Sequence, residues 1–521
     1  MKREPESSAS IFPHSAFRIP PPAASHLTPL NPLLYQINTR CWLRELSAAA
    51  GNPVTLADVP VAEFARWRKL GFTHLWLMGV WTPGPKGRAL ALNEPDLRRA
   101  YNAALPGWRD DDVGGSPYAI ADYRVPPALG GDAGLKQFRD QLHAHGLKLI
   151  LDFVPNHLGL DHAWLRERPD LFVQSPGEAP GTFAQATVAG IGWLAQGKDP
   201  YFAPWTDTVQ LDYRRPATRS AMQELLLSVA ARCDGVRCDM AMLLLSEVFA
   251  KTWAHLPCAT ETPAREFWAE AIPAVKAAQP GFLFLAEVYW GLESRLQELG
   301  FDFTYDKELY DKLFWRDGAG VQRHLLGLSR EARARGAHFL ENHDEPRIAA
   351  QLSPAEQRAA ALVILGLPGM RFLHEGQLTG ARVKLPVQLA RRRAEPPDEA
   401  VAKVYEQLLA NLAGTAVGRG EAQLLAPRAA WPENPTAQNF IIVQWRMQGP
   451  GFDLVVVNLA PHRSQCYVPL VGPELAEHNW SLRDRLGPDT YERFGADLAS
   501  QGLYLDVAAH GAQLFHFEPR R

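Results

Sequence analysis

Four short segments hold the side chains of this sequence that are best suited to chemistry. They read DFVPNH at 152–157, GVRCD at 235–239, LAEVYW at 285–290 and FLENHD at 339–344. Six side chains in these segments are the candidates, namely three acids, one arginine and two histidines: Asp239, Glu287, Asp344, Arg237, His157 and His343. Paired carboxyl groups can serve as a nucleophile and as a general acid and base. A group of like charges is costly to hold together and poorly explained by packing, so the sequence predicts a catalytic site.

Each of these segments ends a short apolar run without alternation of polar and apolar residues. Such runs, for example LKLIL at 147–151 and FLFL at 282–285, are typical of parallel strands buried on both faces. Amphipathic helices fit between them at 132–145, where Asp132 can cap the helix, and at 218–232. Eight strand candidates occur: 33–40, 73–80, 147–155, 234–239, 282–288, 301–306, 337–344 and 370–376. Eight alternating units predict an α/β barrel, with functional residues at the C-terminal ends of its strands.

Two long excursions and one change of pattern interrupt the alternation of strands and helices. Residues 81–129 separate the second and third strands, and a stretch rich in Pro, Gly, Trp and Asp at 157–211 separates the third and fourth. A loop of that length in a compact domain is usually functional, so we expect a small inserted subdomain over one side of the barrel mouth. After a helix near 398–413, short strands separated by turns predict an antiparallel β domain from about 418 to the end.

The composition excludes several classes of protein and favours a reduced compartment. The net charge of -3 gives no electrostatic case for a nucleic acid or an anionic membrane as partner. No apolar stretch approaches the roughly 18 residues of a membrane span, and the polar, Pro-rich residues 1–30 read as a flexible arm without the apolar core of a secretory signal. Five cysteines without CxxC spacing favour reduced thiols. We therefore expect a cytoplasmic protein.

In these four segments the sequence resembles the α-amylase family of glycoside hydrolases, family 13. The segments at 152–157, 235–239, 285–290 and 339–344 look like the four signatures of that family, in the same order. The resemblance covers roughly residues 33 to 521. It implies a (β/α)8 TIM barrel at 31–157 and 212–417, a short inserted domain at 158–211 after the third strand, and a C-terminal antiparallel β-sandwich at 418–521.

The family match assigns three acids and one arginine to the reaction. By resemblance, Asp239 is the nucleophile, Glu287 is the acid and base, and Asp344 grips hydroxyls of the reacting sugar. Arg237 lies two residues before Asp239 on one strand, so it faces the same side and can keep Asp239 ionised. Asp152 is expected to brace Arg237 or the strand end. A buried structural pair is the alternative for Arg237 and Asp239.

Further side chains are expected around the bound sugar. By resemblance, His157 and His343 donate hydrogen bonds to it and Tyr118 stacks on it. Taken alone, His157 reads as a loop-edge histidine and Tyr118 as a core residue. Four tryptophans can be sugar platforms or packing residues, and the sequence does not choose between these roles: Trp81, Trp193, Trp205 and Trp290.

The stretch after Asp239 departs from the family pattern. Many amylases carry a Lys-His pair there, whereas this chain has Met240-Ala-Met-Leu243. We expect either an apolar wall beside the leaving or accepting group, or packing of Met242 and Leu243 into the barrel. Asn156 matches a calcium ligand of the family, but the six to eight oxygens that calcium takes cannot be assembled around it. The prediction is no cofactor and no obligatory metal, with calcium near Asn156 as the alternative.

These observations predict a retaining glycoside hydrolase that cleaves α-glucosidic bonds, α-1,4 first, in malto-oligosaccharides or α-glucans. A transglycosylase of the same family is the alternative, since both share the glycosyl-enzyme intermediate. An inactive family member that acts as a binding subunit is a remote third reading, because all three acids are present. The C-terminal domain is expected to serve packing, or else starch binding through Trp431, Trp445 or Trp480.

Overall fold

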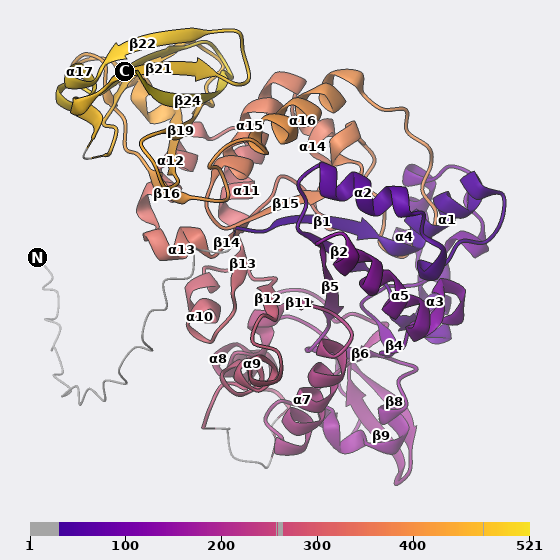
Figure 1. Cartoon of the computed structure of the whole chain (residues 1–521). Coiled ribbons are helices and arrows are strands. Elements are labelled where there is room, and N and C mark those ends of the chain that lie inside the picture. Colours follow the sequence, from indigo (N-terminus) through magenta and orange to yellow (C-terminus); the bar gives the residue numbers. More distant parts are fainter. Residues whose placement is uncertain (1–30, 257, 259–263, 473, 521) are drawn as a thin grey trace, which may run out of the picture.

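The computed structural model of the chain describes residues 31–256, 258, 264–472 and 474–520. The arm expected at 1–30 lies outside the described residues. Eight parallel strands close into a barrel, so the predicted fold class is confirmed (Figure 1). In chain order they are β1 (Leu33–Asn38), β2 (His74–Met78), β5 (Lys148–Phe153), β11 (Gly235–Cys238), β12 (Leu283–Ala286), β13 (Phe303–Tyr305), β14 (Gly336–His338) and β15 (Met370–His374). Each of the eight predicted segments contributes one of these strands.

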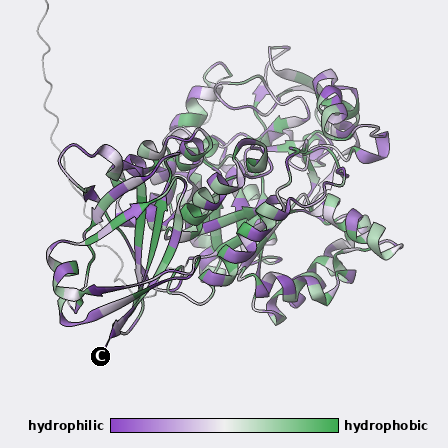
Figure 2. Ribbon diagram, turned by 90° about the horizontal axis from the view of Figure 1, so that it is seen from above, coloured by the Kyte–Doolittle hydropathy of each residue, from purple (hydrophilic) through white to green (hydrophobic). Residues whose placement is uncertain are grey.

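The barrel strands are buried on both faces because side chains fill the interior and helices cover the outside. Figure 2 shows hydrophobic residues along the strands and hydrophilic residues on the outer surface. The connecting helices are α1 (Thr39–Ala50), α2 (Val61–Lys69), α5 (Gly131–Ala144), α7 (Pro216–Ala230), α8 (Ser246–Trp253), α9 (Phe267–Ala278), α10 (Glu293–Glu298), α11 (Lys307–Phe314), α12 (Gly318–Gly327), α13 (Arg330–Ala334), α14 (Ile348–Gln351), α15 (Pro354–Gly366) and α16 (Glu399–Leu412).

One capping prediction is wrong. Helix α5 starts after Gly130, whose φ of 103° lies in the left-handed region, and no side chain caps it. Asp132 lies inside the helix and accepts a hydrogen bond from the Val125 amide at 2.9 Å instead. The carboxylate therefore secures the loop that leads into the helix rather than the helix end itself.

The two excursions form small antiparallel units beside the barrel. After β2, the chain makes β3 (Thr82–Pro83), α3 (Pro85–Asn93), α4 (Pro95–Ala104) and β4 (Ile120–Asp122), with β3 paired to β4. After β5, it makes β6 (His157–Gly159), α6 (Trp164–Glu167), β7 (Gln174–Ser175), β8 (Thr182–Thr187), β9 (Gly190–Ala195) and β10 (Thr208–Gln210). Strands β7, β9 and β8 form one sheet and β10 pairs with β6, so both ends of the second excursion meet at the mouth of the barrel.

The C-terminal residues form two antiparallel sheets around a core of their own, which confirms the expected β-sandwich. The six-stranded sheet contains β16 (Glu421–Leu424), β18 (Phe440–Arg446), β19 (Phe452–Asn458), β24 (Ala512–Arg520), β21 (Asn479–Asp484) and β22 (Thr490–Phe494). The three-stranded sheet contains β17 (Arg428–Ala429), β20 (Ser464–Val468) and β23 (Leu503–Val507), and helix α17 (Gly495–Ser500) follows β22. In the described part of the chain, no helix combines the length and apolarity that a membrane span needs.

Candidate active site

Arg237, on β11, lies at the centre of the predicted acids. Its Nη1 is 2.7 Å from Asp239 Oδ1, and its Nη2 is 2.7 Å from Glu287 Oε2. Asp152 Oδ1 lies 3.6 Å from Nη1, and the Tyr305 hydroxyl accepts from Nε at 3.3 Å. The guanidinium is 1% exposed. One fully buried cation thus joins carboxyl groups at the C-terminal ends of three neighbouring strands, β5, β11 and β12.

The charge balance of this cluster favours one retained proton. Burial raises the pKa of Glu287, Arg237 lowers it, and the charges of Asp239 and Asp344 raise it, so that it comes to about 7. Burial also raises the pKa of Asp239, although Arg237 binds this carboxylate directly. Asp152 has a pKa of about 7, because it is buried. A single guanidinium cannot neutralise several adjoining carboxylates, so Glu287 is suited to remain protonated near neutral pH.

Two further groups hold the Glu287 carboxyl in place. The Met240 backbone N–H donates to Oε2 at 2.8 Å, and the Tyr289 hydroxyl donates to Oε1 at 2.8 Å. Tyr289 lies inside the segment LAEVYW, but sequence reasoning gave it no role. Its position two residues after Glu287 was the available signal, since alternate residues of an extended chain face one side.

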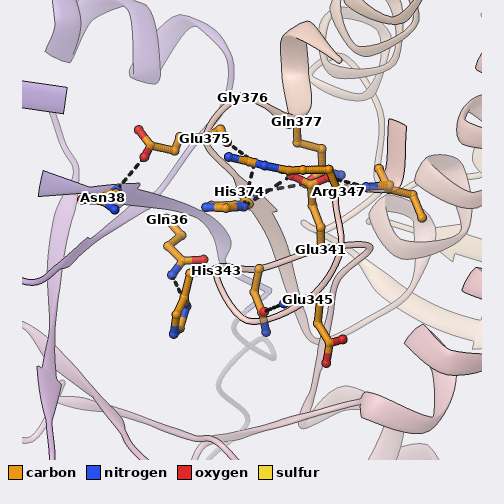
Figure 3. Close-up of polar contacts among 12 residues, drawn as sticks. Gln36, Asn38, Glu341, His343, Glu345, Arg347, His374, Glu375, Gly376 and Gln377 are labelled. Carbon is orange, nitrogen blue, oxygen red and sulfur yellow. Dashed lines mark hydrogen bonds and ion pairs between the residues drawn. The ribbon is translucent and has the colours of Figure 1, made fainter. Parts of the chain in front are cut away.

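Asp344 and His343 follow β14 and form the opposite side of the cluster. His343 Nε2 is 2.8 Å from Asp344 Oδ2. Gln36 Nε2 lies 2.7 Å from His343 Nδ1 (Figure 3). Partial desolvation would raise the pKa of Asp344, but the charge and hydrogen bond of His343, with the charges of Arg237 and Lys384, outweigh it and bring the pKa to about 2. The Asp344 side chain is 44% exposed, so it is the acid of the cluster that solvent reaches most easily.

Tyr118 lies against both His343 and Arg237. Its hydroxyl is 2.7 Å from His343 Nε2, and the two rings stack with centroids 5.3 Å apart. The Arg237 guanidinium lies 5.2 Å from the centroid of the Tyr118 ring. The predicted Tyr118 is therefore part of the cluster, and because its side chain is only half-buried, an edge or face remains for a ligand.

His157 lies at the start of the inserted segment, on β6. Its ring packs on Trp205 with centroids 5.1 Å apart, and its Nδ1 is 3.3 Å from Asn156 Nδ2. Burial lowers the pKa of His157 to about 4, although a hydrogen bond with the Tyr118 backbone acts in the opposite direction. His157 is thus a neutral ring near neutral pH, tied to the same tyrosine that contacts His343.

The apolar stretch after Asp239 divides into two parts. Residues Ala241–Leu244 form a buried 3-10 turn, so Met242 and Leu243 pack into the barrel wall. Met240 alone lies beside the acids, in the left-handed region with φ 43° and ψ 45°. It lines a cavity of about 600 Å³ together with Tyr289 and Trp290. The strained backbone of Met240 is what points its N–H at Glu287.

The tryptophans also divide into packing and exposed residues. Trp81 is 2% exposed and donates from Nε1 to the Asp152 carbonyl, and Trp205 covers His157. Trp290 is 41% exposed and lines the large cavity. Only Trp290 among these three therefore presents a face to a ligand in that cavity.

The residues around Asn156 do not fit a calcium ion. Asn156 Oδ1 accepts a hydrogen bond from Gln210 Nε2 at 3.0 Å, and its carbonyl oxygen accepts from the same amide at 2.9 Å. Both oxygens thus have a protein donor, and an N–H points where a cation would have to lie. Among the residues described, no group of three or more His, Cys, Asp or Glu side chains is arranged for a metal.

A family model described as "Alpha amylase, catalytic domain" matches residues 67–407, which is more than half of the chain. Among curated proteins, Alpha-amylase MalA of Haloarcula japonica is 26% identical over 274 residues, covering 51% of this chain and 36% of that protein. Alpha-amylase 3 of Dictyoglomus thermophilum is 21% identical over 311 residues, covering 55% and 58%. Alpha-1,4-glucan:maltose-1-phosphate maltosyltransferase of Burkholderia pseudomallei is 27% identical over 281 residues, covering 51% and 20%. The alignments thus span less than two thirds of these relatives.

Solved structures share the fold over nearly the whole chain. The "noncanonic maltogenic alpha-amylase AmyB" of Thermotoga neapolitana superposes with a TM-score of 0.65 at 18% identity, covering 94% of this chain and 99% of that one. An α-amylase of Geobacillus thermoleovorans, complexed with acarbose, gives 0.65 at 17% identity, covering 95% and 100%. The chain therefore belongs to the α-amylase family.

Proposed function

We propose that the chain is a retaining glycoside hydrolase that cleaves α-glucosidic bonds, α-1,4 bonds first, in malto-oligosaccharides or α-glucans. The observation that carries this proposal is the contact of one guanidinium with both Asp239 and Glu287 at 2.7 Å. Two carboxyl groups held by a single guanidinium lie close together, as a retaining pair about 5–5.5 Å apart requires. The wider separation of an inverting pair, which leaves room for a water, is less compatible with this arrangement.

In the first step, Asp239 attacks the anomeric carbon while the bond to the glycosidic oxygen breaks. Glu287, with its pKa of about 7, gives its proton to that oxygen, and a glycosyl ester forms on Asp239. In the second step, Glu287 takes a proton from water, the water oxygen attacks the anomeric carbon, and Asp239 leaves as carboxylate. We expect Asp344, His343 and His157, which lie around this pair of acids, to bind hydroxyl groups of the same sugar.

The charge of the large cavity argues for a neutral leaving group. Tyr289 and Met240 both contact Glu287 and line the cavity of about 600 Å³. The cavity therefore lies next to the proton donor. Six carboxyl groups line it against one lysine and one histidine: Asp199, Glu293, Asp306, Glu308, Asp311, Glu345, Lys307 and His324. Such a wall repels phosphate. We therefore favour an unphosphorylated glucan over the phosphorylated sugars in the names of two relatives, the maltose-1-phosphate maltosyltransferase and trehalose-6-phosphate hydrolase.

A transglycosylase is the second candidate, and Met240 favours it. Its half-buried side chain stands beside the acid where the second nucleophile arrives. An apolar group there binds water poorly and packs against a sugar ring, which favours a sugar hydroxyl as the acceptor.

Product analysis separates the two candidates. The protein is incubated with maltotriose, and glucose and maltose as the only products establish hydrolysis, whereas products longer than maltotriose establish transfer. Proton NMR of the first product identifies its anomer, and a β-anomer would exclude the retaining mechanism. Asp239→Asn should lower kcat by a factor on the order of ten thousand or more and leave the fold intact. Turnover by this variant at the parent rate would refute the assignment of Asp239.

A further inference from the structure

Two loops meet across one half of the barrel mouth. The chain after α4 and the chain after β15 pair through Gly114 N to Gln388 O at 2.8 Å and Ala390 N to Asp112 O at 2.7 Å. An antiparallel bridge joins Val113 to Leu389 between these bonds. We call residues 112–114 and 388–391 the loop clamp. Its two halves are about 275 residues apart in sequence, so this contact is a tertiary feature that no local pattern encodes.

An ion pair between the partly exposed Arg391 and the buried Asp112 fixes the loop clamp. Arg391 donates from Nε and Nη2 to the two carboxylate oxygens of Asp112 at 2.7 and 2.6 Å. Arg44 of α1 adds a contact to Asp112 Oδ1 at 2.9 Å. The Asp112 side chain is 0% exposed, and the hydrogen bonds from Arg391 hold its pKa well below the usual range. A bidentate pair of this kind is directional as well as strong, so it holds the two loops in one register.

The loop clamp is anchored to the ends of neighbouring barrel strands. Arg40, just after β1, donates to Gly115 O at 3.0 Å and to Val387 O at 2.8 Å, and so binds both loops. Lys384 donates to the carbonyl oxygen of Asp344, after β14. Strands β14, β15, β1 and β2 are consecutive in the barrel. Hydrogen bonds therefore hold both loops to the chain at the C-terminal ends of β1 and β14.

Little space remains between His343 and the segment at 384–387, which leads into the second half of the loop clamp. The cavity between His343, Asn342 and the loop at 384–387 measures about 20 Å³, which holds about one water molecule and no sugar ring. Glu375 accepts a hydrogen bond from the backbone N–H of Asn38 (Figure 3). It also forms an ion pair with Arg392 at 2.8 Å. Glu375 and Arg392 also line a separate cavity of about 440 Å³, so this ion pair forms the wall between the two spaces.

On the opposite side, the cavity of about 600 Å³ opens beside Met240 and Tyr289. The cluster of acids thus has one closed side, behind His343, and one open side, next to the proton donor Glu287. The leaving group lies next to the proton donor, because the acid protonates its oxygen. We propose that the loop clamp makes this an exo-acting enzyme, which takes a single terminal glucosyl unit from the non-reducing end; this rests on the proposed function.

Binding to an inactive variant tests this inference separately from turnover. Titration calorimetry on Asp239→Asn measures the binding of three sugars. The first is maltoheptaose, and the second is maltoheptaose blocked by a benzylidene acetal on its non-reducing terminal sugar. The third is maltoheptaitol, in which the reducing end of unblocked maltoheptaose has been reduced. We expect the acetal to weaken binding by about tenfold or more, because the closed side cannot take it, and reduction at the other end to change binding less than about threefold. Equal binding of the blocked and free sugars, or no binding of either, overturns the inference. If maltoheptaose binds but the parent enzyme does not cleave it, the proposed function is wrong and the inference about the closed side is unaffected.

A variant of the loop clamp gives an independent measurement. Arg391→Ala removes the bidentate pair, and in the Asp239→Asn background it should reduce the discrimination against the blocked sugar by about tenfold. Arg463→Ala, which removes a pair with Asp506 in the C-terminal domain, is the matched control and should leave the discrimination unchanged. Unchanged discrimination in a folded Arg391→Ala protein overturns the role of the clamp. If this variant does not fold, the comparison of blocked and free maltoheptaose on Asp239→Asn with an intact clamp still tests exo action.

Discussion

At the scale of single residues, Asp239 and Glu287 can differ in protonation although both contact Arg237. Arg237 binds Asp239 Oδ1 and Glu287 Oε2 at equal distances of 2.7 Å, so position relative to the cation does not separate them. The difference lies in the other contacts: the pKa of Glu287 reaches about 7 because burial is reinforced by two neighbouring carboxylates. Environments that push two carboxyl groups apart are how one site supplies both an acid and a nucleophile.

The pH dependence of kcat/KM should follow from these two groups. Glu287 must hold its proton to act as the acid, so activity is present below its pKa of about 7 and is lost as the pH rises through it. Asp239 must be ionised, and because its pKa is raised, activity is lost on the acidic side at a higher pH than an exposed aspartate would give. A bell-shaped profile with an alkaline limb near pH 7 is therefore expected for maltotriose, its two limbs belonging to the coupled pair.

Glu287→Gln provides the control for this assignment. With an aryl glycoside, whose leaving group departs without a proton, the variant should retain activity and lose the alkaline limb. If the alkaline limb is unchanged in this variant, a group other than Glu287 causes it. Asp152, with a pKa of about 7, is then the nearest candidate.

At the scale of elements, the strands and the residues at their ends could be predicted from the sequence, because both are local properties. A non-alternating apolar run followed by an acid identified β11, β12 and β14, and the order of the runs indicated the barrel. Contacts between distant loops could not be predicted in this way. The pairing of Asp112 with Arg391 depends on two irregular segments, and the Asn156–Gln210 pair depends on the return of the inserted segment as β10. Their residues carry no periodicity that would connect them.

The turn from β11 into the buried 3-10 segment allows a direct test of the apolar wall. Met240→Gly removes the side chain beside Glu287, and glycine adopts φ 43° without the steric cost of about 1 kcal/mol that methionine bears. We expect an unchanged or higher Tm, and a ratio of transfer to hydrolysis that falls by roughly fivefold, as loss of about 1 kcal/mol of acceptor binding would give. The products of concentrated maltotriose measure this ratio.

Met242→Leu is the matched control, because Met242 is fully buried two residues away and does not line the cavity. Its product ratio should equal that of the parent. If Met240→Gly also leaves the ratio unchanged, Met240 does not select the second nucleophile.

The hydrogen bonds between Asn156, just before β6, and Gln210 on β10 lead to a prediction about calcium. Since Gln210 occupies both oxygens of Asn156, addition of EDTA should change neither kcat nor Tm. Gln210→Ala should lower the stability by about 1–3 kcal/mol, because buried polar atoms of Asn156 lose their partner. A fall in Tm with EDTA that calcium reverses would contradict this view of the site.

At the scale of the whole molecule, the C-terminal β-sandwich is joined to the barrel through its larger sheet. Trp445 on β18 is fully buried and donates from Nε1 to the Gly366 carbonyl at the end of α15, at 2.7 Å. Val455 of β19 packs near the same glycine, where an added Cβ would lie 2.8 Å from its side chain. Helix α15 leads directly into β15, whose C-terminal end carries the Glu375 that contacts β1. The sandwich therefore supports one of the strands that hold the closed side of the site.

Trp445→Ala should therefore destabilise the whole protein, by about 3–5 kcal/mol as expected for loss of a buried tryptophan. Thermal unfolding followed by calorimetry would show this as a lower Tm of the barrel transition rather than of a separate C-terminal one. Trp431→Ala is the control, because this tryptophan is 50% exposed and its loss should change stability by less than about 0.5 kcal/mol.

The Trp431→Ala variant also distinguishes packing from starch binding. Trp480 and Trp445 are 0% exposed, so of the three tryptophans expected as starch ligands only Trp431 presents a surface. Retention on insoluble starch that Trp431→Ala abolishes, with an unchanged Tm, would make the domain a binding module as well as a support for the barrel.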